Sequence, residues 1–171
     1  ACHQFQPDEY ALNGKLLENT YEEWKLSRHA REGRTCQSCH MPERRHLWRG
    51  IHDPKMVRSG VDFSVERPDL AGAVVRTALI LTNSGTGHYF PTYVTPRLIA
   101  EIEQVASDGR PLPGTRVQQL IQRAVPLDLG REIADTRLPP DGEMRLVYEH
   151  ARERAAVAVI YRLRVEPDEF Y

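Results

Sequence analysis

Strand-forming residues are densest in one stretch of the chain, Ala73-Val74-Val75-Arg76-Thr77-Ala78-Leu79-Ile80-Leu81-Thr82. The stretch stops at Asn83-Ser84-Gly85-Thr86-Gly87, a run of residue types that favours a turn. Valine, isoleucine and threonine pack well on a pleated sheet, and a run of this length matches a buried strand. We therefore predict that residues 73–82 form a central strand and that the chain turns directly after them.

Further strands are predicted on the C-terminal side. Leu98, Ala100 and Ile102 alternate with other residues over 98–103, as do Met144, Leu146 and Tyr148 over 144–149. The segment 155–165 reads as a final strand, whereas 116–126 is ambiguous and could form a short helix. Turn signals separate these segments at Ser107-Asp108-Gly109 and Pro139-Pro140-Asp141-Gly142. Short strands separated by turns favour an antiparallel β-sandwich over residues 71–171.

The N-terminal side has a different pattern. Residues 19–30 predict a helix, because Asn19 or Thr20 can cap its start and Gly33 lies just past its end. Prolines and glycines make residues 40–70 read as loops and short helical turns. We therefore expect an α+β chain with an irregular, helical segment at 1–70 and strands at 71–171.

Composition excludes several classes of protein. The 171 residues carry a formal net charge of −1, whereas nucleic-acid binders show a basic excess. No apolar run approaches the roughly 20 residues of a membrane-spanning helix. All three cysteines and six of the seven histidines lie at or before residue 88, so site chemistry is expected in the N-terminal half.

One motif carries a specific chemistry, Cys36-Gln37-Ser38-Cys39-His40. In a CxxCH motif two thiols add to the vinyl groups of one haem, and the following histidine binds its iron. We therefore predict that Cys36 and Cys39 attach a haem c covalently and that His40 is the proximal iron ligand.

The start of the chain, Ala1-Cys2-His3, has the form of the end of a second CxxCH motif. Its first cysteine would precede residue 1, so Cys2 would attach and His3 would ligate a second haem of a longer polypeptide. The alternative is a free surface cysteine that happens to precede a histidine.

Cys36 and Cys39 have three alternative interpretations: a zinc site, a redox pair and a disulfide. With His46 and His52 they resemble a Cys₂His₂ zinc site, but six residues between Cys39 and His46 are fewer than a zinc finger uses. A thioredoxin-like redox pair would require a βαβ setting, which the pattern lacks. A disulfide across two residues would be strained.

Two segments resemble the multihaem c-type cytochromes. The first is Thr35-Cys36-Gln37-Ser38-Cys39-His40-Met41-Pro42, preceded by Trp24-x-x-Ser27-x-His29-Ala30. The second is Asn83-Ser84-Gly85-Thr86-Gly87-His88-Tyr89-Phe90-Pro91-Thr92, which is similar to a stretch that begins the β-sandwich in those proteins. The resemblance implies the same order of haem segment and sandwich here.

Each haem iron then needs a second axial ligand. Four histidines are candidates for this distal position: His29, His88, His52 and His46. The resemblance favours His29, on the tryptophan-bearing helix, and His88, in a glycine-rich loop that leaves room for a porphyrin. Asp53 could orient His52, and His46 follows a charged loop. Met41 is excluded for its own haem, since a residue next to the proximal ligand cannot reach the opposite face.

Other side chains suit the surroundings of a haem. The aromatic residues Tyr21, Trp24, Trp48 and Phe90 could pack on haem faces, and Arg44, Arg45 and Arg49 could pair with its propionates. His150 is expected at the surface.

These features predict an electron-transfer protein with at least one haem c, and a second if Cys2 and His3 hold one. Its partners would be other haems of the same polypeptide and partner redox proteins, with no nucleic acid and no transmembrane segment in this chain. Two alternatives stay open: a multihaem enzyme acting on a small nitrogen or sulfur compound at a five-coordinate haem, and a docking module for a partner cytochrome. Covalent haem implies a periplasmic or extracellular location.

Overall fold

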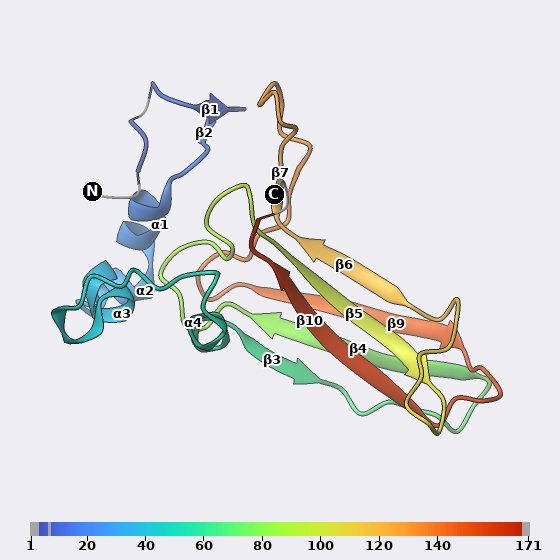
Figure 1. The fold of residues 1–171 in the computed structure, drawn as a ribbon. Coiled ribbons are helices and arrows are strands. Elements are labelled where there is room, and N and C mark those ends of the chain that lie inside the picture. Colours follow the sequence, from blue (N-terminus) through green and yellow to red (C-terminus); the bar gives the residue numbers. More distant parts are fainter. Residues whose placement is uncertain (1–3, 7, 169–171) are drawn as a thin grey trace.

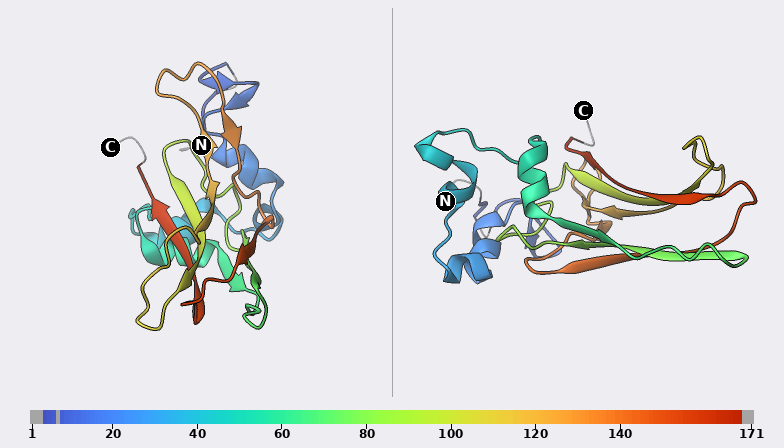
Figure 2. Two further views of the ribbon diagram at one scale, coloured as in Figure 1. Left: turned by 90° about the vertical axis from the view of Figure 1, so that its right-hand side faces the viewer. Right: turned by 90° about the horizontal axis from the view of Figure 1, so that it is seen from below.

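The structure is a computed structural model that describes residues 4–6 and 8–168. Short helices gather at one end of the molecule, and long strands extend away from them (Figures 1 and 2). The helical elements are α1 (Thr20–Leu26), α2 (Arg28–Arg31), α3 (Cys36–His40), η1 (Pro42–Arg44) and α4 (Pro54–Gly60). None of the helices in the described residues has the length and apolar character that would let it cross a membrane.

The strands pair in antiparallel fashion throughout. They are β1 (Ala11–Leu12), β2 (Lys15–Leu16), β3 (Asp62–Val65), β4 (Val74–Thr82), β5 (Arg97–Val105), β6 (Val117–Ile121), β7 (Arg123–Ala124), β8 (Ala134–Asp135), β9 (Glu143–Ala151) and β10 (Ala158–Glu166). Two sheets have three strands, in the orders β3-β4-β9 and β10-β5-β6, and β1-β2 and β7-β8 are two-stranded.

The predicted antiparallel β-sandwich is wrong. The strands are divided among four small sheets, and no single pair of extended sheets accounts for residues 71–171. Prolines and glycines interrupt the chain between 106 and 142, so β6 reaches five residues and β7 and β8 only two each. The mixture of short helices with antiparallel strands is compatible with the broader α+β expectation.

The strand predictions themselves fare better. β4, β5, β9 and β10 each span nine residues. β5 and β9 include the predicted segments 98–103 and 144–149, β4 begins one residue after the start of the predicted 73–82, and β10 begins three residues after the start of the predicted 155–165. Met144, Leu146 and Tyr148 are buried along β9, between exposed neighbours, as their alternation indicates. The ambiguous segment 116–126 forms strands β6 and β7 instead of a helix.

The helix predicted at 19–30 is broken at Ser27. Ser27 has an extended backbone, and its hydroxyl donates to the carbonyl of Trp24 at 2.7 Å and accepts from the Ala30 amide at 3.4 Å. Because the side chain ends α1 and caps α2, the chain changes direction there. Trp24 and His29 consequently belong to different helices.

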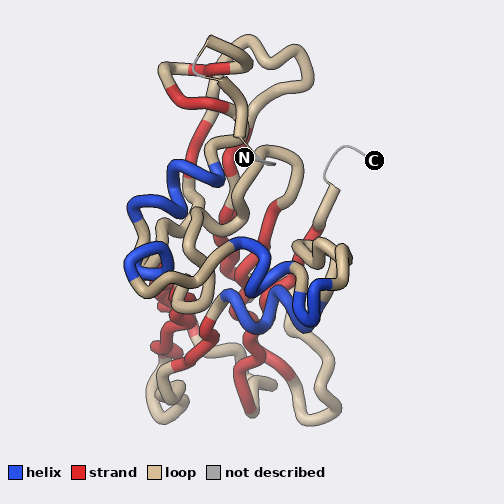
Figure 3. Tube along the Cα trace, turned by 90° about the vertical axis from the view of Figure 1, so that its left-hand side faces the viewer, coloured by secondary structure: helices blue, strands red, loops and turns tan. Residues whose placement is uncertain are grey.

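The hydrophobic core joins the strands to the helical end. It contains Leu79 and Leu81 of β4 and Leu98 and Ile102 of β5, and it continues through residues of α4 and of the loop after β4, Val57 and Phe90. Phe90 N donates to Leu138 O at 2.8 Å, and Leu138 N to Phe90 O at 2.9 Å. The loop that follows β4 is thereby fixed to the core, and this loop carries His88. Viewed toward the helical end, the helices cluster over the ends of the strands (Figure 3).

Candidate functional site: a histidine pair in an apolar cavity

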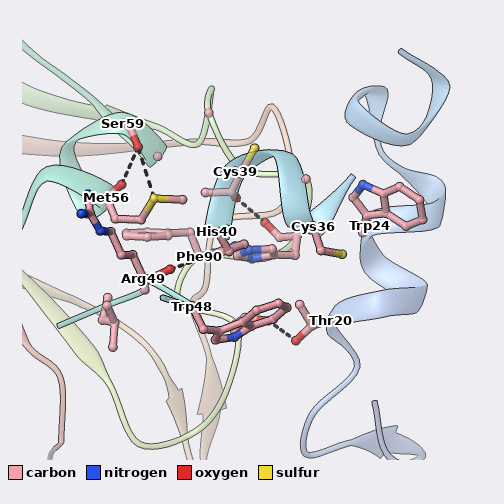
Figure 4. A pocket seen from close by; sticks show the side chains of 18 of the residues that line it. Thr20, Trp24, Cys36, Cys39, His40, Trp48, Arg49, Met56, Ser59 and Phe90 are labelled. Atoms are coloured by element: carbon pink, nitrogen blue, oxygen red, sulfur yellow. Dashed lines mark hydrogen bonds between the residues drawn. The ribbon is translucent and has the colours of Figure 1, made fainter. Parts of the chain in front are cut away.

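The CxxCH motif forms the short helix α3. Thr35 caps it, accepting a hydrogen bond from the Ser38 amide at 3.3 Å, and the Ser38 hydroxyl donates to Thr35 O at 2.7 Å. Cys36 and Cys39 are free thiols three residues apart on the helix, and His40 ends it. Figure 4 shows the three side chains on α3, and all three line the same pocket.

A cavity of 820 Å³ lies between α3 and the loop after β4. Its volume is in the range of pockets that enclose a small organic ligand or cofactor, about 300–1,000 Å³. Both motif cysteines and most of the predicted site residues line it: Trp24, His29, Cys36, Cys39, His40, Trp48, Arg49, His52, His88 and Phe90. Segments far apart in the sequence therefore meet at one chamber.

His40 is oriented by a backbone carbonyl. Its Nδ1 lies at hydrogen-bonding distance from Arg49 O (Figure 4). Since a carbonyl oxygen can only accept, Nδ1 donates this hydrogen bond, and Nε2 is the ring nitrogen that could bind a metal. A histidine held in this way is suited to bind a metal, because the backbone fixes both the tautomer and the ring orientation.

His88 repeats the same arrangement from the opposite side of the cavity. Its Nδ1 is 2.8 Å from Tyr89 O, so its Nε2 is also left with a lone pair. Burial lowers the pKa of His88 from 6.5 to about 4, with smaller contributions from the nearby His40, His29 and Arg137. The ring is therefore neutral at pH 7, the form that binds metals.

The two imidazole rings stand 6.2 Å apart between centroids, with their planes 21° apart. A metal–nitrogen bond of about 2.0 Å plus about 1.1 Å from nitrogen to ring centroid, on both sides of one ion, would separate the centroids of two imidazoles by about 6.2 Å. The distance between the two rings is therefore compatible with His40 and His88 together holding one metal ion.

The His88 loop is held by buried polar contacts. Asn83 is fully buried, and its amide donates to His88 O at 2.9 Å and to Leu138 O at 3.0 Å. Glu23 of α1 accepts from the Tyr89 amide at 2.9 Å. Burial raises the pKa of Glu23, although the Tyr89 hydrogen bond and Arg137 oppose the rise. These contacts fix the peptide group that joins His88 to Tyr89.

Arg137 completes the support of the loop. Its guanidinium donates to Thr92 O at 2.9 Å, lies 4.9 Å from the Tyr89 ring centroid and pairs with Asp135 at 2.8 Å. Sequence reasoning missed Glu23 and Arg137, because they contact the loop from 40 or more residues away, and it missed Asp135, which pairs with Arg137. Asn83, by contrast, was within the quoted loop motif.

We predict that the Arg137–Asp135 pair stabilises the fold in a pH-dependent way. Burial alone would raise the pKa of Asp135, but hydrogen bonds and charge from Arg137 outweigh it and lower the pKa to about 2. Because the folded pKa is below the unfolded value of about 3.9, the contribution of about 2 kcal/mol is present above pH 4. It is lost as the pH falls toward 2.

Denaturant unfolding at pH 7 and at pH 2.5 measures this effect. Asp135→Asn should lower the free energy of unfolding by about 2 kcal/mol at pH 7 and by much less at pH 2.5. Asp128→Asn, a change at an exposed aspartate, is the control and should lower it by under about 0.5 kcal/mol. Equal losses for Asp135→Asn at both pH values would contradict the prediction.

Gly85 and Gly87 line the cavity, and they also have a packing role that the sequence did not predict. A Cβ on Gly85 would lie 1.9 Å from Ser59 O, and one on Gly87 would lie 2.9 Å from Trp24 Cδ1 and 3.1 Å from His29 Cβ. The glycines therefore leave room for protein, α4 on one side and α1–α2 on the other. Their absence of side chains lets these helices close on the His88 loop.

His29 is a buried histidine with unpaired ring nitrogens. It is 3% exposed, and neither Nδ1 nor Nε2 has a hydrogen-bond partner in the described part of the chain. Burial lowers its pKa, so the ring is neutral at pH 7. An unsatisfied buried polar group costs about 1–3 kcal/mol, which indicates that an absent partner completes this site.

His52 and His46 lie differently. His52 lines the cavity but is exposed, and its Nε2 is 3.5 Å from Asp168. Asp53, expected to orient it, caps α4 instead by accepting from the Lys55 amide at 2.9 Å.

His46 is exposed and does not line the cavity. His150, predicted at the surface, is half-buried and stacks on Tyr148 with centroids 5.8 Å apart.

The part of the chain that the structure describes does not show the cluster of ligands that the zinc-site alternative requires. Among the described residues, no group of three or more His, Cys, Asp or Glu side chains gathers closely enough to hold a metal ion. Cys36, Cys39, His46 and His52 accordingly do not come together. Cys2 and His3 lie outside the described residues.

All the aromatic candidates line the cavity, but only one of the three basic candidates does. Tyr21, Trp24, Trp48 and Phe90 all line the cavity, and the Trp48 and His40 rings lie 5.3 Å apart. Arg49 lines it too, whereas Arg44 and Arg45 do not. Arg34, which the sequence reasoning passed over, is the second arginine at the cavity.

The chain has a structural relative among solved proteins. It superimposes on a penta-heme cytochrome c552 from Thermochromatium tepidum with a TM-score of 0.68 and 19% sequence identity. The match covers 95% of this chain and 45% of that one, so the chain spans less than half the length of the relative. No protein-family model and no curated protein sequence matches it. Cytochrome-like architecture thus emerges from the structure: the chain shares its fold with a multihaem cytochrome.

Proposed function

We propose that the chain is the electron-transferring part of a multihaem c-type cytochrome. In this proposal Cys36 and Cys39 hold one haem through thioethers, and His40 and His88 are the axial ligands of its iron. The bound haem would supply reversible one-electron cycling between Fe(III) and Fe(II). The observation that carries the proposal is the 6.2 Å spacing of the two imidazoles beside the CxxCH helix.

The chain's own residues would set the properties of that centre. Arg49 O and Tyr89 O accept hydrogen bonds from the two imidazoles, and the aromatic lining would give the haem apolar surroundings. The two arginines that line the cavity, Arg34 and Arg49, suit the propionates. Two neutral imidazoles without a methionine favour a low reduction potential.

The histidine pair favours electron transfer over catalysis at this haem. An enzyme acting on a small nitrogen or sulfur compound needs an iron with one open axial position. In the proposed centre, His40 and His88 occupy both positions. A substrate would therefore have to displace a histidine that the protein holds rigidly.

A second haem belongs to the proposal. Cys2 and His3 would attach it together with a cysteine upstream, and the unpaired nitrogens of buried His29 suit the distal ligand of a haem other than that of His40. In this assignment residues 1–70 bind haem, and residues 71–171 supply the strands and His88. Covalent haem would place the protein in the periplasm or outside the cell.

Covalent haem attachment is directly measurable. We expect the purified protein to retain its haem in acidified organic solvent, and an alkaline pyridine haemochrome assay with intact mass to count at least one haem per chain. Cys36→Ser together with Cys39→Ser should lower that count by one, because no thioether can form. Ser38→Ala is the matched control within the motif and should keep it. A chain without covalent haem would refute the proposed function.

A further inference from the structure

The segment that surrounds the cavity is strongly basic. Residues 28–58 contain eight arginine and lysine side chains against three acidic ones, a formal charge of +5. The whole chain carries −1, so the other residues together carry −6. The positive charge of the protein is therefore concentrated around the candidate haem site.

Five of these cations have no carboxylate partner within the described part of the chain. Glu32 pairs with Arg28 and Arg34, and Asp53 pairs with Arg49. The remaining five are exposed, and we call them the basic rim: Arg31, Arg44, Arg45, Lys55 and Arg58. Each stands one to three residues from a residue that lines the cavity, yet none lines it itself.

Haem propionates do not account for the basic rim. Arg34 and Arg49 line the cavity and can serve both carboxylates of one haem. The rim side chains belong instead to the outer surface of α2, η1 and α4 and the residue after η1. Their charge is available to a molecule that approaches from outside.

Apolar residues lie next to the rim residues in the sequence. Leu47 lines the cavity and is 39% exposed. The ring centroid of the adjacent Trp48 is 6.5 Å from that of exposed His46 and 5.3 Å from that of half-buried His40. An apolar centre within a charged, solvated ring is the usual composition of a protein–protein interface. The aromatic rings also bring this surface close to the proximal ligand.

We propose that the basic rim is the docking surface for an electron-transfer partner protein with an acidic surface around its own redox centre. The inference rests on the proposed function of the same site. Complementary charge would speed the encounter and align the partner's redox centre with the cavity. The observed rim does not fit a membrane anchor, because its helices have seven residues or fewer and offer no long amphipathic face.

Stopped-flow reduction of the oxidised haem protein tests the proposal, with the hydroquinone of an acidic flavodoxin as the probe. One electron passes from the flavin to Fe(III), leaving Fe(II) and a flavin oxidised by one electron. At low salt the second-order rate constant should be high, and it should fall about tenfold or more between 10 mM and 500 mM salt. Arg44→Glu with Arg45→Glu, and separately Lys55→Glu with Arg58→Glu, should each lower the low-salt rate about tenfold and flatten the salt dependence.

The matched control is Arg110→Glu with Arg154→Glu. These exposed arginines lie in the loops at the far end of the strands, and the charge change is the same. We expect less than about a twofold change in rate, because these charges lie at the opposite end of the strands from the helices that carry the rim. As a sign check, anionic ferricyanide should oxidise the reduced protein faster at low salt than at high salt, and cationic hexaammineruthenium(III) should show the opposite trend.

Several results would overturn the docking surface. The first is that the rim variants react as fast as the unaltered protein. The second is that the far-end control loses as much of the low-salt rate as the rim variants do. The third is that the rim substitutions reduce only cosedimentation with phosphatidylserine vesicles and leave the rate unchanged. A haem count in each sample separates this failure from that of the proposed function. Covalent haem with rates insensitive to the rim refutes the docking surface alone, whereas absence of covalent haem refutes the proposed function itself.

Discussion

Replacing His88 with alanine is expected to convert one haem almost completely from a low-spin to a high-spin or water-ligated form. The proposed thioethers of Cys36 and Cys39 would not depend on His88, so the covalent haem count should not change. Water donates less electron density to iron than imidazole, so the reduction potential of that haem should rise. Optical and electron paramagnetic resonance spectra of the purified variant, with a redox titration, measure both effects.

Added imidazole should reverse the spectral change. His88→Ala leaves space at the position of a ring 6.2 Å from that of His40, and a free imidazole can occupy it. His52→Ala and His46→Ala are the matched controls, since both side chains are exposed and each removes one imidazole. They should keep the low-spin spectrum. A low-spin His88→Ala protein with unaltered potentials would contradict the assignment and return His52 and His46 to consideration.

Local patterns were sufficient for the main strands. The nine-residue strands β4 and β9 pair in register from Val74 with Ala151 to Thr82 with Glu143, and the alternating burial of β9 is visible in the sequence. The expected sandwich was wrong because periodicity identifies a strand but does not say how many strands join one sheet. The break at Ser27 also escaped prediction, since a serine fits either within a helix or at its cap.

Some residues of the candidate site could likewise be identified from local sequence patterns, whereas others could not. Cys36, Cys39 and His40 are adjacent in sequence, so spacing alone was enough to bring them together. His88 was selected by a motif, and its approach to His40 requires the fold. Glu23 and Arg137 could not be found from the sequence, because a lone glutamate in a helix and a lone arginine in a loop carry no sign of the 66- and 45-residue contacts they make with the His88 loop.

The role of the glycines is where structure and sequence reasoning diverge most, and it leads to a large expected effect on stability. Gly85→Ala would place a methyl group 1.9 Å from Ser59 O and 2.9 Å from Ser59 C. Both atoms are backbone at the C-terminal end of α4, and Gly85 N donates to Gly60 O at 3.1 Å across the same contact. Neither side can move without separating α4 from the His88 loop.

We expect Gly85→Ala to lower the free energy of unfolding by about 3 kcal/mol or more, at the upper end of overpacking effects. Gly87→Ala should cost less, because its Cβ meets the side chains of Trp24, Ser27 and His29, which can shift. Gly72→Ala is the control: it has no contact closer than 3.9 Å, and its change should stay within about 0.5–1 kcal/mol. Denaturant unfolding of the three variants measures the ranking.

The same three variants test whether the glycines support the histidine pair. Because α4 and the His88 loop close on each other at Gly85, their separation should also loosen His88 and increase the high-spin fraction. Gly72→Ala lies outside this contact and should leave the spectrum unaltered. If Gly85→Ala proved as stable and as low-spin as Gly72→Ala, the close approach of Ser59 to Gly85 would have no part in holding His88. The loop would then owe its position to Asn83, Glu23 and Arg137 alone.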